Sequence, residues 1–224
     1  MDVNTFWGKQ NSFLTDYQNL SIPVGTMTLI EFNELYAMIV QNYYLTNHKR
    51  AKIQIADLGC WTGRTTCFFG EIAKELDGRV TSIDDFSGRD SLCGAAFLFN
   101  IQNIWNRNIS LSGLEQYVSL KVGDVCNIAE LFKDDSLDVV FIDVSRKYGE
   151  MKQTLDAWHP KLKHRGLMCG CDADVLLNYN FKSKFKDKPQ DYFLNHFVGI
   201  DVAVPEKNAS AKRTHSGSIW YYTK

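Results

Sequence analysis

Four carboxylates that each end a short apolar run are the side chains of this chain best placed for chemistry. They are Asp57, Asp84, Asp124 and Asp143. A carboxylate attracts a cation such as an ammonium or a sulfonium, and it accepts hydrogen bonds from the hydroxyl groups of a sugar. A ligand that carries both a positive charge and a ribose would therefore suit this set of acids.

A glycine turn follows the first of these acids. Residues 53–66 begin as a short apolar run, turn at Gly59 and Gly63, and continue with a helix-compatible pattern. Such a junction directs unpaired backbone N–H groups and the positive end of a helix dipole at a bound ligand. We expect Gly59 to let a ligand approach the backbone and Gly63 to let the helix pack closely on the sheet.

The turn departs from a dinucleotide-binding loop at two positions. Trp61 stands where the fingerprint Gly-x-Gly-x-x-Gly has its middle glycine, so a pyrophosphate would have little room. Asp57 would repel the negative charge of a pyrophosphate. Asp84 lies about twenty residues beyond the glycines, and in a doubly wound sheet that spacing places it within reach of a ribose diol.

The runs that end in these acids must be neighbouring strands of one sheet if the acids are to act together. Alternating strand and helix patterns predict a Rossmann-like, doubly wound α/β fold, in which ligands bind outside the carboxyl ends of the strands. We expect helices at 28–42, 65–76, 94–105, 128–132 and 149–158. We expect strands at 53–57, 78–85, 118–125, 137–143, 166–172, 197–204 and 218–223. The last two strands flank a polar connection at 206–217 and predict a C-terminal antiparallel hairpin in a seven-stranded, mostly parallel sheet.

Length and composition limit the number of domains and the partners. With 224 residues, 45% of them hydrophobic, and no repeats, the chain forms one domain with one large core. We divide it into an N-terminal helical cap (1–50), a cofactor-binding core (51–172), and a substrate-side insertion with the hairpin (173–224). A net charge of -1 gives no attraction to nucleic acid or to an anionic membrane.

The cellular compartment follows from what the sequence lacks. The chain has neither a signal-peptide pattern nor an apolar run of membrane-spanning length, so we expect a cytoplasmic protein. Its six cysteines are then reduced small hydrophobes, and Cys169-x-Cys171 has no second Cys or His pair with which to form a zinc site.

The pattern Asp-x-Gly-x-x-x-Gly at 57–63 resembles the first motif of class I S-adenosylmethionine-dependent methyltransferases. The segments 138–143, 155–163 and 166–172, with Tyr148, further resemble the small-molecule O-methyltransferase-like branch, which includes macrolide-sugar and catechol-type enzymes. The similarity covers roughly residues 50–172 and the final strand, and it implies S-adenosylmethionine as the cofactor.

The resemblance assigns a role in cofactor binding to most of the residues singled out above. The residues at the methionine and ribose end would be Asp57, Gly59, Trp61, Gly63 and Thr65. Asp84 would bind the ribose, whereas Asp85 and Asp124 would lie near the adenine. Asp143 would sit under the methionine moiety and the methyl acceptor.

The resemblance is weakest where many members of that branch carry Gly-Asp-His and a magnesium site. Here Asp143 is followed by Val-Ser-Arg-Lys. Asp143 and Asp172 offer two oxygens to magnesium, but an octahedral ion needs more ligands or several waters, and Arg146 and Lys147 would compete with it. Asp143, Asp172 and Lys147 are the candidate bases, although Asp143 can equally serve only the cofactor, Asp172 can be a turn residue, and Lys147 a solvated lysine.

We therefore expect methyl transfer from S-adenosylmethionine to an oxygen of a small molecule, with selectivity set by residues 1–25, 86–108 and 173–196. Two alternatives stay open. A non-catalytic S-adenosylmethionine-binding protein would explain the replaced Gly-Asp-His positions, and an NAD-dependent oxidoreductase is opposed by Trp61 and the C-terminal hairpin. The aromatic N-terminal segment can serve a homodimer interface as readily as a lid.

Overall fold

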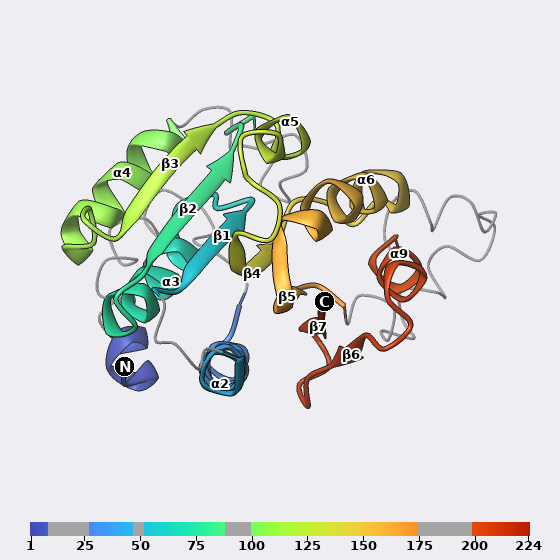
Figure 1. Cartoon of the computed structure of the whole chain (residues 1–224). Helices are drawn as coiled ribbons and strands as arrows, with labels where there is room; N and C mark the ends of the chain where they lie inside the picture. The colour runs from blue at the N-terminus through green and yellow to red at the C-terminus, as the bar shows by residue number, and fades with distance from the viewer. Residues whose placement is uncertain (9–26, 47–51, 88–99, 174–198) are drawn as a thin grey trace, which may run out of the picture.

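A seven-stranded sheet forms the centre of the computed structural model, which describes residues 1–8, 27–46, 52–87, 100–173 and 199–224 (Figure 1). The strand order is β3-β2-β1-β4-β5-β7-β6. The bounds are β1 Gln54–Leu58, β2 Arg79–Asp84, β3 Val118–Val122, β4 Leu137–Ile142, β5 Leu162–Gly170, β6 Lys212–Arg213 and β7 Trp220–Thr223. Strands β1 to β5 are parallel, and β7 is antiparallel to both β5 and β6. This arrangement confirms the predicted doubly wound sheet and its antiparallel C-terminal end.

Helices cover both faces of the sheet. They are α2 Leu29–Thr46, α3 Arg64–Glu75, α4 Ile101–Ser112, α5 Val125–Ala129, α6 Tyr148–Trp158 and α9 Gly199–Lys207. Because neighbouring strand residues point to opposite faces, β4 directs Phe141 toward the core formed with α2, α3 and α4, and Val140 toward the core formed with α5, α6 and α9. The central strand is thus buried on both sides, as its unbroken apolar sequence predicts.

The N-terminal residues join the first of these cores. Residues 3–8 are helical, and the Phe6 ring packs edge-on against Phe32 of α2 and Phe68 of α3, with centroids 5.7 and 5.6 Å apart. Within the described ranges, no helix is long and apolar enough to span a membrane.

The predicted strand at 197–204 is wrong, because residues 199–207 form helix α9. Ile200, Ala203 and Val204 are buried at helical spacing, and α9 packs beside α6. A short apolar run such as 197–204 is compatible with a buried strand and with a buried helix, so the sequence pattern alone does not separate the two. Pro205 lies inside this helix rather than ending a strand. The predicted polar connection at 206–217 contains the end of α9 and the short strand β6.

The helix predicted at 94–105 continues beyond its expected end, because α4 spans Ile101–Ser112. Helix α4 begins after Asn100, whose side chain accepts a hydrogen bond from the backbone N–H of Asn103 and caps the helix. Gly113, at φ 64°, ends it. The asparagines in this stretch therefore cap and continue the helix instead of weakening its end, while 94–99 lie outside the described residues.

Candidate active site at the carboxyl edge of the sheet

Backbone hydrogen bonds join the loops that leave the carboxyl ends of the strands. The Gly59 N–H donates to the carbonyl of Ile83 at 2.8 Å, and the Asp143 N–H donates to the carbonyl of Leu58 at 2.9 Å. The Gly123 N–H donates to the carbonyl of Asp84 at 3.0 Å. The loops after β1, β2, β3 and β4 are therefore held side by side, and the sequence correctly places the acids of these loops at one edge.

Asp84 fastens the glycine turn to the end of β2. One carboxylate oxygen accepts from the Trp61 N–H at 2.8 Å, and the other accepts from the Phe86 N–H at 2.7 Å. Burial raises the pKa of Asp84, although these two N–H groups oppose the shift. Each oxygen keeps a second lone pair, so the carboxylate can still accept hydrogen bonds from a ribose diol.

The glycines of the turn are required by contacts within the chain. A Cβ on Gly59 would lie 2.0 Å from the Asp143 carbonyl oxygen, and one on Gly63 would lie 2.9 Å from Cδ1 of Trp105. Their φ angles of 81° and 89° also favour glycine. Gly59 thus makes room for the end of β4, and its expected role in letting a ligand approach the backbone stays a prediction. Gly63 makes room for α4 rather than for the sheet.

Asp57 lies behind the turn and has no exposed surface. The hydroxyl of Thr66 donates to it at 2.6 Å, and the hydroxyl of Thr65 lies 3.2 Å from both of its oxygens. Burial raises the pKa of Asp57 to about 7, despite these two donors. Asp57 thus supports the start of α3, with Thr65 and Thr66 as its partners. The expected contacts of Asp57 and Thr65 with the cofactor stay predictions.

Asp85 and Asp124 organise the loops after β2 and β3. Asp85 accepts from the Ser87 N–H at 2.8 Å, and the exposed Asp124 caps α5 by accepting from the N–H groups of Cys126 and Asn127, both at 3.0 Å. Their expected place near an adenine stays a prediction.

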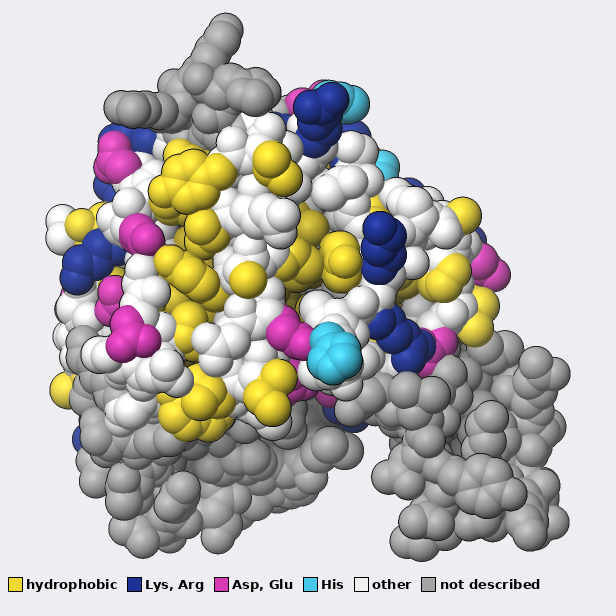
Figure 2. Space-filling model, turned by 90° about the horizontal axis from the view of Figure 1, so that it is seen from below, with side chains coloured by type: hydrophobic (Ala, Val, Ile, Leu, Met, Phe, Trp, Pro, Cys, Tyr) yellow, Lys and Arg dark blue, Asp and Glu magenta, His cyan; other side chains and the backbone are white. Residues whose placement is uncertain are grey.

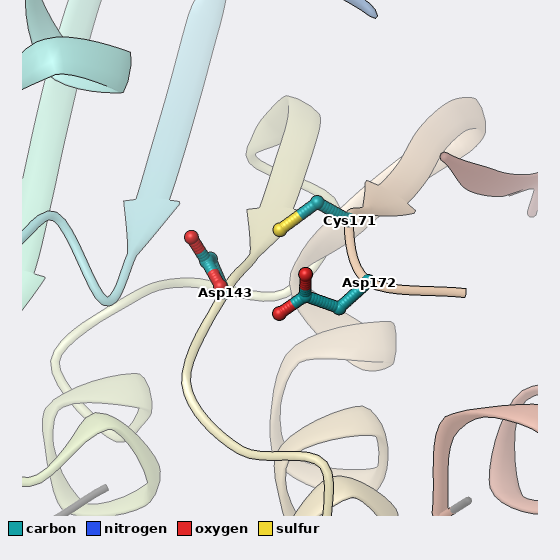
Figure 3. Close-up of side chains that lie close together, drawn as sticks. All are labelled: Asp143, Cys171 and Asp172. Atoms are coloured by element: carbon teal, nitrogen blue, oxygen red, sulfur yellow. The ribbon is translucent and has the colours of Figure 1, made fainter. Parts of the chain in front are cut away.

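The loops after β4 and β5 bring together Asp143, Cys171 and Asp172 (Figure 3). One ligand-type atom of each lies within 4.8 Å of the others. The Asp143 side chain is exposed, but nearby protein atoms reduce its solvation, and this loss of solvation, followed by the charge of Asp172, raises its pKa. The Cys171 thiol and the charge of Arg146 oppose that shift. The arrangement gives Asp143 a tendency to take up a proton, which a general base requires.

Two basic residues follow Asp143, and they have different partners. Arg146 Nη2 lies 2.5 Å from Asp172 Oδ2. Lys147 precedes α6, and its ammonium lies 3.1 Å from Glu150 Oε1. Of the three candidate bases, the structure therefore places Asp143 and Asp172 together, while Lys147 makes an ion pair in the first turn of α6.

The described residues of this cluster do not fit a magnesium ion. Magnesium takes about six hard oxygen ligands, and a cluster of two carboxylates and a thiol would leave most of these positions to waters. Burial raises the pKa of Cys171 well above its usual value, and sulfur is a soft ligand that suits magnesium poorly. Arg146 already occupies one oxygen of Asp172.

Sequence reasoning missed the contribution of Cys171 to this cluster, because a strand cysteine in a reduced protein is typical of a small core residue. It considered Arg146 as a competitor of magnesium and as a neighbour of Lys147, and missed its contact with Asp172. The predicted substrate-facing segments at 1–25, 86–108 and 173–196 fall largely at 9–26, 88–99 and 174–198, outside the described residues, and stay predictions.

A protein-family model described as a methyltransferase domain matches residues 56–172. Curated proteins provide no match to the sequence. Similar solved structures include a putative caffeoyl-CoA O-methyltransferase from Staphylococcus aureus, with a TM-score of 0.65, 16% identity, and coverage of 95% of this chain and 91% of the other. A putative O-methyltransferase from Klebsiella pneumoniae has a TM-score of 0.62, 14% identity, and coverage of 96% and 90%. The O-methyltransferase TomG from Streptomyces achromogenes, in complex with SAM, has a TM-score of 0.56, 11% identity, and coverage of 96% and 89%.

Proposed function

This chain belongs to the methyltransferase-domain family, and from that premise we propose that it transfers the methyl group of S-adenosylmethionine to an oxygen of a small molecule. The observation that carries the proposal is the position of Asp84, which ends β2 and holds the glycine turn through the Trp61 N–H. A carboxylate at this point of a doubly wound sheet is suited to a ribose diol. TomG holds SAM on the same fold, which supports this choice of cofactor.

The charge of the edge also fits a cationic cofactor. Asp84 ends β2, Asp85 follows it, and Asp143 follows β4, so these acids lie on either side of β1. The described part of this edge has no arrangement suited to a pyrophosphate, because Trp61 stands in the glycine turn. When bound, the cofactor supplies an electrophilic methyl group on a sulfonium. The carboxylates lower the energy of that positive charge in the bound state.

Methyl transfer to a hydroxyl requires that the acceptor oxygen lose its proton. The bond from sulfur to the methyl carbon breaks as the bond from the acceptor oxygen forms, and the hydroxyl proton passes to a base. Asp143 is our choice for that base, because its carboxylate is accessible at the end of β4 and its pKa is raised. The O-methyltransferases among the similar structures support oxygen as the acceptor atom.

Calorimetric titration with S-adenosylhomocysteine tests the cofactor. We expect micromolar binding by the wild type, at least about tenfold weaker binding by Asp84→Ala because charged hydrogen bonds to the diol are lost, and no binding of NAD. Asp134→Ala is the matched control, since this acid pairs with Lys161 before β4, at the opposite edge of the sheet. Binding of NAD without binding of S-adenosylhomocysteine would refute the proposal.

Turnover separates an enzyme from a non-catalytic cofactor-binding protein. Incubation with methyl-labelled S-adenosylmethionine and a panel of phenols, carboxylic acids and sugars should label at least one class. Cofactor binding with no label on any acceptor would favour the binding protein.

A further inference from the structure

A guanidinium lies where the carboxylates of the candidate site would otherwise attract a metal ion. Arg146 contacts Asp172, and Asp172 belongs to the cluster with Asp143 and Cys171. The Arg146 and Asp172 side chains are 25% and 23% exposed, so the pair lies at the surface of the site rather than inside the core. We propose that Arg146 is the resident cation of this site, and that it takes the place of a divalent metal.

Electrostatics explains why a cation is needed here. Two carboxylates this close repel each other, and ionisation of both is stabilised by an opposite charge nearby. Arg146 supplies that charge through a charge-assisted hydrogen bond. A divalent ion that bound the same oxygen of Asp172 would have to displace the guanidinium and then lie next to its positive charge.

The inference rests on the proposed function and narrows the class of acceptor. A guanidinium carries one charge and shares it with Asp172, so it lowers the energy of an acceptor oxyanion less than a directly bound divalent ion would. Phenols, enols and carboxylic acids ionise with little assistance, whereas aliphatic alcohols need much more. We therefore infer an acceptor with an acidic hydroxyl or a carboxyl group.

Titration of free Mn²⁺, followed by its electron paramagnetic resonance signal, tests this assignment on the full chain. The wild type should give no saturable binding. Arg146→Met, which keeps an unbranched side chain and removes the charge, should bind Mn²⁺ saturably, at least about tenfold more tightly than the weakest binding that the titration detects, a difference of about 1.4 kcal/mol. Arg146→Lys keeps the charge and should behave as the wild type, and Asp172→Asn added to Arg146→Met should abolish the gain.

Saturable Mn²⁺ binding by the wild type that is lost in Asp172→Asn would overturn the proposal, as would an absence of gain in a folded Arg146→Met protein. Circular dichroism melting reports whether each variant folds. S-adenosylhomocysteine binding, measured on the same samples, reports the cofactor site separately, so a failure of the resident cation is distinguishable from a failure of the proposed function.

Helix α2 carries an uncharged exposed stripe on the face shown in Figure 2. The exposed residues of the stripe are Ile30, Asn33, Ala37, Gln41, Tyr44 and Leu45. Of the six large apolar side chains that are exposed among the described residues, three lie on this one helix. Exposed apolar side chains that gather on one surface mark an interaction site more often than apolar side chains that are scattered singly.

The two charged residues of α2 lie outside the stripe and have partners. Glu31 accepts a hydrogen bond from the Ser218 hydroxyl, and Glu34 accepts one from the backbone N–H of Ser216 at 2.9 Å. Both contacts direct the carboxylates toward the loop between β6 and β7. Thus no charge interrupts the exposed stripe.

The order of residues in the stripe is self-complementary about Ala37. Ile30 and Tyr44 are equally distant from Ala37 in sequence, as are Asn33 and Gln41. Two copies packed antiparallel around a two-fold axis at Ala37 would pair Ile30 with Tyr44 and the two amides with each other, and the small Ala37 would allow close approach. We propose that α2 is a dimer interface and that its occupant is the α2 of a second copy.

The size of this surface predicts a weak dimer. A helix of 18 residues is about 27 Å long, and a pair of such helices buries less than the roughly 800 Å² per partner of a standard interface. We therefore expect a reversible dimer whose fraction rises with protein concentration.

Sedimentation velocity over a wide concentration range tests this interface with two matched double variants. Asn33→Glu with Gln41→Lys places opposite charges across the two-fold axis and should dimerise at least as well as the wild type. Asn33→Lys with Gln41→Lys places like charges there and should be monomeric. Leu131→Lys, an exposed change on another surface, should leave the dimer intact. A monomeric wild type at every concentration, or equal behaviour of the two folded double variants, would refute the interface.

Discussion

Replacing Asp57 by asparagine should change how the stability of the protein depends on pH. Asp57 is fully buried behind the glycine turn, and its pKa is raised from 3.8 to about 7, chiefly by burial. In the unfolded chain the group returns to its ordinary pKa. Between these two values the folded state binds more protons than the unfolded state, so stability falls as pH rises through this window and levels off above it.

The size of the effect follows from the two pKa values. One pKa unit corresponds to about 1.4 kcal/mol, so the full window corresponds to about 4 kcal/mol as an upper limit. The asparagine side chain would keep an oxygen that accepts from Thr66 and would not ionise. We expect Asp57→Asn to be close to the wild type near pH 4 and to be more stable than the wild type near pH 8, by an amount approaching that limit.

Urea unfolding of both proteins across this pH range measures the difference directly. Subtracting one free energy of unfolding from the other removes the contribution of every group that titrates alike in the two proteins. A difference that stays constant from about pH 4 to about pH 8 would show that Asp57 ionises normally in the folded protein, and the reasoning would be wrong.

Three further changes test the packing around the site. Gly59→Ala should lower the free energy of unfolding by at least about 1 kcal/mol in urea and weaken S-adenosylhomocysteine binding, because the new Cβ collides with the Asp143 carbonyl and the φ angle is positive. Gly149→Ala is the matched control. It has open space at its Cβ and should stay within about 1 kcal/mol of the wild type in the same assay. Asn100→Ala removes the cap of α4 and should cost about 1 kcal/mol by thermal unfolding, whereas Asn100→Ser should recover most of it. Trp158→Ala should cost about 3–5 kcal/mol by urea unfolding, because the ring is fully buried; a cost below about 1 kcal/mol would contradict that burial.

The sheet was predictable from the sequence because local patterns specify its strands. The apolar runs that end in Asp84 and Asp143 also fix where their carboxylates fall, since parallel strands meet at one edge. Helix α9 was missed because the short apolar run at 197–204 fits a buried strand as well as a buried helix, and the contact with α6, which favours the helix, is not encoded locally.

The finer parts of the candidate site depend on contacts between distant residues. Gly59 is required by a carbonyl oxygen 84 positions later, a crowding that no spacing rule reveals. The sequence placed Arg146 near Asp143 but gave no indication that it pairs with Asp172, because that contact joins the loops after β4 and β5. Sequence patterns thus located the carboxyl edge of the sheet, whereas the contact partners of Gly59 and Arg146 became apparent only in the folded structure.

The backbone hydrogen bonds that join the loops at this edge extend the ladder of the sheet beyond its strands. The amide hydrogens of Gly59, Asp143 and Gly123 should therefore exchange with solvent deuterium only when the central sheet opens, at rates like those of β1 and β4. A cofactor that binds here meets a surface that is already ordered before it arrives, so little of its binding free energy is spent on arranging the chain.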